Sequence, residues 1–167
     1  MILLPISRQS YQRGFTLIEL ILVIVLLGVL AVFITPVSLS NSVFYARGFH
    51  DETLALLRFA QKSAIAQRRT VCVEFSGVLG ATLGIADSAA ATTCSIDLQG
   101  PYDVNSATVA INARSSVVYS ATPSDFNFDG LGQPVDEQGA LVPSKTIQVV
   151  NASKTITVEM ITGYVHD

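Results

Sequence analysis

Histidine, cysteine and charged residues are scarce in this sequence. Its 167 residues include two histidines and two cysteines, and only 14% of the residues are charged. This leaves little material for general acid–base catalysis, and the sequence contains no nucleophile elbow, no phosphate-binding loop and no pair of metal-ligating residues on a helix. We therefore expect a protein that is not an enzyme and that uses no cofactor.

Positive charge is also too sparse for a typical nucleic-acid-binding protein. The formal net charge is −3, and the only basic residues after Arg114 are Lys145 and Lys154. Proteins that bind nucleic acids usually gather lysine and arginine on one face. The composition therefore argues against DNA or RNA as a partner.

One long apolar run lies near the start of the chain. Between residues 15 and 37 the only charged side chain is Glu19, and the residues before the run include Arg8 and Arg13 but no acid. As a helix, about 23 residues can cross a hydrocarbon core of about 30 Å. A positively charged flank stays in the cytoplasm. The sequence therefore predicts a single membrane helix over residues 15–37, with the following domain on the outer side.

Two simpler interpretations of this run are a secretory signal peptide and a plain membrane anchor. The apolar run is longer than the usual signal-peptide core, and no small-residue cleavage site follows it at the expected distance. A plain anchor leaves Glu19 without a purpose, because a carboxylate inside a membrane segment is costly and usually functional. Both interpretations remain open, but neither accounts for the whole segment.

The residues at 13–20, RGFTLIEL, resemble the signature of type IV prepilins. The resemblance implies that residues 1–14 are a leader, that a prepilin peptidase cuts between Gly14 and Phe15, and that it methylates the new amine of Phe15. It further implies that Glu19 pairs with the amine of a neighbouring subunit during assembly. Pro36 stands where many pilins have a proline that kinks the helix.

This resemblance also implies partners and a location. The partners would be other pilins or pseudopilins, the prepilin peptidase and an assembly platform in the inner membrane. The chain would first be a single-pass protein of the bacterial inner membrane with its head in the periplasm. It would then become part of a pilus or pseudopilus.

The helical pattern continues beyond the apolar run and then changes to alternation. Leu54, Leu57, Ala60 and Ala64 recur at steps of three and four, so residues 38–69 are expected to continue the helix. Pro36 and Gly48 weaken helices. We therefore predict one helix over residues 15–69 that is bent or loosened around 36–48.

Residues 70–167 have the pattern of a β-rich head. Strand-like runs cover residues 70–75, 83–86, 108–112, 117–120, 145–150 and 155–161. In the first of these, Val71, Val73 and Phe75 should face one side of the sheet, and Cys72 the other. A long helix followed only by strands predicts an α+β fold, in which the second half of the helix packs on an antiparallel sheet.

The second half of the sequence resembles the GspH/FimT group of minor pilins and pseudopilins. The resemblance rests on the spacing of Phe126, Phe128, Gly130, Gly132 and Pro134, with two late strands and Gly163 near the end. It implies a minor subunit of a type IV pilus, for example an MSHA-type pilus. The alternatives are a pseudopilin of type II secretion and a pilus-tip module that binds DNA or a surface. DNA binding is disfavoured because residues 163–167 include no lysine or arginine.

The two cysteines are candidates for a disulfide. Cys72 lies on the first expected strand, and Cys94 begins a later run. In an oxidising compartment a bridge between them would close a loop of about 20 residues and stabilise the fold by about 3 kcal/mol. Two reduced, unpaired cysteines are the alternative.

One acidic segment matches part of a calcium-loop pattern. Asp125, Asn127, Asp129 and Asp136 occupy positions one, three, five and twelve of that loop. Position twelve lacks the usual glutamate, Pro134 lies inside the loop, and strand-like segments flank it. We therefore expect no metal site overall, and treat these residues as a weak calcium candidate next to a simpler role as the polar edge of a strand and its loop.

Overall fold

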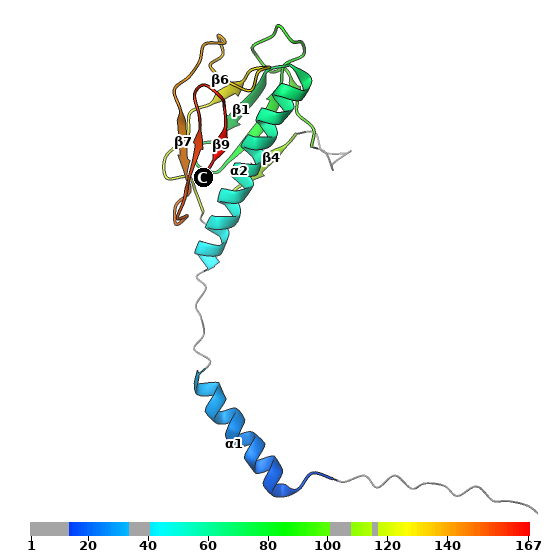
Figure 1. Cartoon of the computed structure of the whole chain (residues 1–167), viewed down its shortest axis with the longest axis vertical. Helices are drawn as coiled ribbons and strands as arrows, with labels where there is room; N and C mark the ends of the chain where they lie inside the picture. The colour runs from blue at the N-terminus through cyan, green and yellow to red at the C-terminus, as the bar shows by residue number, and fades with distance from the viewer. Residues whose placement is uncertain (1–13, 34–40, 101–107, 115–116) are drawn as a thin grey trace, which may run out of the picture. The chain divides into compact units, whose positions relative to one another are not determined.

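The computed structural model describes residues 14–33, 41–100, 108–114 and 117–167. The described residues belong to two units, one that contains only the helix α1 (Leu17–Phe33) and one that contains everything from the helix α2 (Asn41–Gln67) onward. Figure 1 shows the strands gathered around α2 in this second unit, which we call the head.

Within the described residues, nine strands follow α2. They are β1 (Val71–Phe75), β2 (Gly80–Ile85), β3 (Ile96–Asp97), β4 (Ala110–Asn112), β5 (Phe126–Phe128), β6 (Pro134–Val135), β7 (Lys145–Gln148), β8 (Thr155–Val158) and β9 (Val165–His166). The first six form a sheet of order β3-β2-β1-β5-β6, in which β4 also pairs with β2, and the last three form a second sheet. The pairs are antiparallel. The predicted α+β class is therefore confirmed.

The core lies between α2 and both sheets. The helix contacts β1, β2, β4 and β5 of the larger sheet and β9 of the smaller one. Its buried residues meet buried valines, isoleucines and phenylalanines of the strands, and the cluster includes Phe49, Leu57, Ala60, Ala64, Val71, Leu83, Phe128, Ile156 and Val165. The expected helical stripe at Leu54, Leu57, Ala60 and Ala64 is therefore the face that packs on the sheets.

A polar contact is built into this core. The hydroxyl of Thr53 donates to the carbonyl of Phe49 at 2.7 Å and lies 3.0 Å from the hydroxyl of Tyr119. Burial raises the pKa of Tyr119 to about 12, although the hydrogen bond with Thr53 lowers it in part. The contact gives two buried hydroxyls a partner and ties α2 to the segment between β4 and β5.

The helix was predicted to be bent or loosened around residues 36–48. For residues 41–48, which the structure describes, this prediction is wrong. The helix α2 begins at Asn41 and passes through Gly48 without a break. Its buried face already includes Ala46 and Phe49, so burial against the sheets outweighs the weak helix propensity of one glycine. Residues 34–40, and with them Pro36, lie outside the described part of the chain.

The helix also ends earlier than predicted. It stops at Gln67 rather than at Arg69, because Arg68 adopts a left-handed conformation with φ 50°. The N–H of Arg69 then donates to the carbonyl of Ala64 at 3.2 Å, which is the hydrogen bond of a Schellman cap. The helix end at Gln67 could not be predicted from sequence patterns, because glycine usually occupies the left-handed position that Arg68 takes here.

Most predicted strands are present, with shorter or shifted limits. Strands β1, β2, β4, β7 and β8 fall on predicted runs, whereas the run at 117–120 contributes only an isolated bridge between Tyr119 and Val149. Buried and exposed side chains do not alternate along β1 as predicted, because Cys72 is buried like its neighbours. A loop covers it, since the hydroxyl of Thr70 donates to the carbonyl of Ala91 at 2.9 Å and Cys94 bonds to Cys72.

Candidate cleavage and assembly segment

The segment around the expected cleavage site leads into a capped helix. Gly14 and Phe15 precede α1, and Phe15 is exposed. The N–H of Glu19 donates to Oγ1 of Thr16 at 3.3 Å, and the N–H of Leu20 donates to the carbonyl of Thr16 at 3.2 Å. Thr16 is therefore the N-cap of α1, and the helix begins at Leu17 rather than at the predicted Phe15.

The spacing of Thr16 and Glu19 matches a local pattern of helix starts that was not predicted from the sequence. A threonine followed three residues later by a glutamate is the capping-box pattern, in which the two residues satisfy free N–H groups at a helix start. A carboxylate in the first turn also interacts favourably with the helix dipole. The structure shows the half of the capping box in which the N–H of Glu19 donates to Thr16. Pairing of the Glu19 carboxylate with a neighbouring subunit stays a prediction.

The helix α1 exposes its apolar side chains. From Leu17 to Leu30 it presents leucine, isoleucine and valine on all sides, each between 43% and 76% exposed. A helix that is apolar on all sides is one that other apolar groups normally cover.

Within residues 14–33, 41–100, 108–114 and 117–167, the structure contains no helix that is both long and apolar enough to cross a membrane.

The two cysteines form the predicted disulfide. Cys72 of β1 is bonded to Cys94 in the loop that precedes β3, with 6.0 Å between their Cα atoms. The bond fastens this loop against the outer face of the larger sheet, where Asn127 also donates to the carbonyl of Thr92 at 3.2 Å. The bridge is therefore part of what covers β1 and β5.

The four calcium candidates are engaged in different backbone contacts. Asp125 accepts from the N–H of Phe75 at 2.7 Å. Asp129 accepts from two N–H groups of its own turn at 2.9 and 2.8 Å, and Asp136 accepts from two in the next turn, both at 2.9 Å. In the described ranges no three acidic, histidine or cysteine side chains gather as metal ligands would. The structure thus gives these residues the strand-and-turn role, and calcium binding stays an untested prediction.

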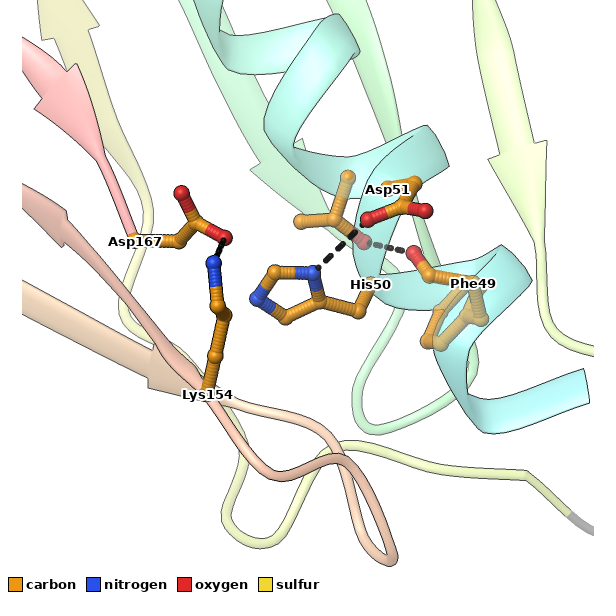
Figure 2. Close-up of polar contacts among 6 residues, drawn as sticks. Phe49, His50, Asp51, Lys154 and Asp167 are labelled. Atoms are coloured by element: carbon orange, nitrogen blue, oxygen red, sulfur yellow. Dashed lines mark hydrogen bonds and ion pairs between the residues drawn. The ribbon is translucent and has the colours of Figure 1, made fainter. Parts of the chain in front are cut away.

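A small charged cavity of about 340 Å³ lies beside the first half of α2, where the sequence indicated nothing. Figure 2 shows His50 between Asp51 and the pair formed by Lys154 and Asp167. Nδ1 of His50 lies 3.2 Å from Asp51, and Nε2 is buried without a partner in the described residues. Lys154 donates to Asp167 at 2.8 Å, and this hydrogen bond lowers the pKa of the Asp167 carboxyl.

Comparison with known proteins identifies the first segment. Residues 9–35 match the family model described as the prokaryotic N-terminal methylation motif. The chain carries the methylation motif of prokaryotic prepilins. The predicted resemblance to type IV prepilins is thereby confirmed for this segment, which includes Gly14, Phe15 and Glu19.

Solved structures similar to this chain include two of the type IV minor pilin FimU from Pseudomonas aeruginosa PAO1. The crystal in space group P65 has a TM-score of 0.46 and 12% identity, and covers 72% of this chain and 90% of FimU. The crystal in space group P21 has a TM-score of 0.46 and 14% identity, and covers 76% and 87%. No curated protein gives a significant match.

Proposed function

We propose that the chain is a structural subunit, of the minor type, of a type IV pilus. The observation that carries this proposal is the methylation motif at residues 9–35, which covers the start of a helix with exposed apolar side chains on all sides. A prepilin peptidase would remove residues 1–14 and methylate Phe15. The segment 15–37 would then hold the chain in the inner membrane, with α2 and residues 70–167 together as the periplasmic head.

The chemistry of the new terminus explains why assembly would need Glu19. Cleavage creates an amine on Phe15 in an apolar setting, and an unpaired charge there costs several kcal/mol. The carboxylate of Glu19 on an adjacent subunit is a suitable partner, and each pairing would fix the axial position of one subunit against the next. Other pilins and the inner-membrane assembly platform are the partners in this proposal. A pseudopilin of type II secretion remains the alternative prediction.

Two substitutions at Glu19 separate assembly from helix capping. Glu19→Gln retains a side chain that can complete the capping box but removes the charge, whereas Glu19→Ala removes both. If the charge pairs with the amine, both variants should be cleaved normally, but their amount in sheared filaments should fall by about tenfold or more. The measurement is an immunoblot of sheared and membrane fractions from a bacterium that produces type IV pili.

The glutamine variant decides between the two roles of Glu19. Normal incorporation of Glu19→Gln together with loss of Glu19→Ala would mean that Glu19 serves only as a helix cap. Normal incorporation of both variants would contradict any role in assembly. Cleavage, followed by gel mobility in the same samples, shows that both variants reach the membrane.

A further inference from the structure

The bridge between Cys72 and Cys94 borders two surface cavities. One has a volume of about 420 Å³ and is lined by both cysteines, by residues of β1 and β5 and by the turn after β6. The other has a volume of about 160 Å³ and is lined by Cys94 and by residues of β1, β2 and β3. Cys72 is only 6% exposed, whereas Cys94 is partly exposed. A small reductant therefore approaches the bridge from the side of Cys94.

The charged side chains that line these two cavities are all carboxylates. The larger cavity is lined by Glu74, Asp125, Asp136 and Glu137, and the smaller one by Glu74 and Asp97. Among the described residues, no lysine, arginine or histidine lines either cavity. Carboxylates are ionised at neutral pH, and charges of one sign that line a cleft create a field within it. The approach to the bridge is therefore negatively charged.

Two basic side chains in this part of the head have hydrogen bonds elsewhere. Arg69 precedes β1, and its guanidinium donates to the carbonyl of Ala86. Lys145 at the start of β7 donates to the hydroxyl of Ser124 at 2.6 Å, beside Asp125. Neither basic residue lines a cavity at the bridge. Lys145 can offset part of the charge at Asp125, but the other four carboxylates remain.

Reduction of a disulfide begins with the attack of a thiolate, which is an anion. The thiolate forms a bond to Sγ of Cys94 while the bond between the two cysteine sulfurs breaks, and the electron pair of that bond stays on Sγ of Cys72. A second thiolate then attacks the reductant sulfur in the mixed disulfide and releases Cys94. Two reductant thiols are thereby oxidised to a disulfide, and their protons pass through the solvent to the two cysteines.

We propose that the five carboxylates around the bridge shield it from reduction by anionic thiols. They repel the incoming thiolate, and they also disfavour the thiolate that forms at the buried Cys72. A reductant with a second negative charge is repelled more strongly, whereas one with a positive charge is not. Electrostatic steering of this kind changes association rates by about tenfold or more and weakens as salt is added. The head thus retains its bridge longest in the presence of anionic thiols.

Two thiols of the same length test the shield on the full chain in an uncharged detergent with a chelator. Mercaptoethanesulfonate has two negative charges as a thiolate, whereas cysteamine has one negative and one positive charge. A maleimide that traps the released cysteines gives each rate, which is divided by the thiolate concentration and by the rate with an uncharged small disulfide. At low salt cysteamine should react about tenfold faster or more, and in about 1 M salt the ratio should fall toward one.

Two double variants with the same change in net charge make the result specific. Glu74→Gln with Glu137→Gln removes two exposed carboxylates of the shield and should lower the ratio of the two rates at low salt several-fold. Glu52→Gln with Glu159→Gln removes two carboxylates that line neither cavity and should leave the ratio unchanged. A ratio close to one at low salt in the native chain, equal effects of the two double variants, or a folded chain that neither thiol reduces would overturn the proposal.

Discussion

Replacement of Gly163 by alanine is expected to lower the stability of the head by about 3 kcal/mol or more. Gly163 has φ 62°, and this left-handed conformation costs an alanine about 1–2 kcal/mol. A Cβ atom at this position would also lie far inside the contact distance of the Gly132 carbonyl oxygen, which belongs to the backbone of another turn. The two turns would have to move apart, and such overpacking costs about 1–3 kcal/mol more.

Gly77→Ala is the matched control for this substitution. Gly77 has nearly the same backbone angle, φ 61°, but an added Cβ there would meet nothing within 4 Å. It should therefore show only the backbone cost of about 1–2 kcal/mol. Urea unfolding of a fragment that begins at Leu39, followed by circular dichroism, measures both. Equal losses for the two variants would contradict the close approach of the turns at Gly132 and Gly163.

Removal of the disulfide is expected to cost the head about 3 kcal/mol. The bond joins residues that are 22 positions apart, and closing a loop of this length restricts the unfolded chain by about that amount. We suggest the double variant Cys72→Ala and Cys94→Ala, because Cys72 is buried and a serine there would add a buried hydroxyl. Its unfolding midpoint in urea should be lower than that of the unchanged head.

A reductant provides the control for this prediction. Reduction should lower the urea midpoint of the head with its native sequence toward that of the double variant. It should not alter the midpoint of the double variant itself. A thiol assay should find free thiols in the unfolded, unchanged head only after reduction. Free thiols without reductant, or equal midpoints in all samples, would contradict a structural role for the bond.

The prepilin-like segment, the buried stripe of the helix and the order of the elements could be predicted because each depends on local patterns, whereas the exact limits of the helices could not. The prepilin-like residues at 13–20 are contiguous, and the helical stripe from Leu54 to Ala64 repeats over several turns. The disulfide also followed from few possibilities, since only Cys72 and Cys94 were available. The order of one helical region and then strands was sufficient for the α+β class.

Features that depend on contacts between distant residues were not predictable. The two-residue strands β3, β6 and β9 exist because a neighbouring strand pairs with them. Two residues are too few to show the alternating pattern that would predict a strand. The helix end at Arg68 lacks the usual glycine. The charged cavity beside His50 is lined also by Lys154 and Asp167, which lie more than a hundred residues later in the chain.

Whether this chain is processed as a prepilin can be read from its intact mass. The full chain would be produced together with a prepilin peptidase, extracted from membranes and measured by mass spectrometry. The expected product begins at Phe15 and carries about 14 Da more, the net gain when one methyl group replaces a hydrogen. A chain that still begins at Met1 in the presence of an active peptidase would contradict it.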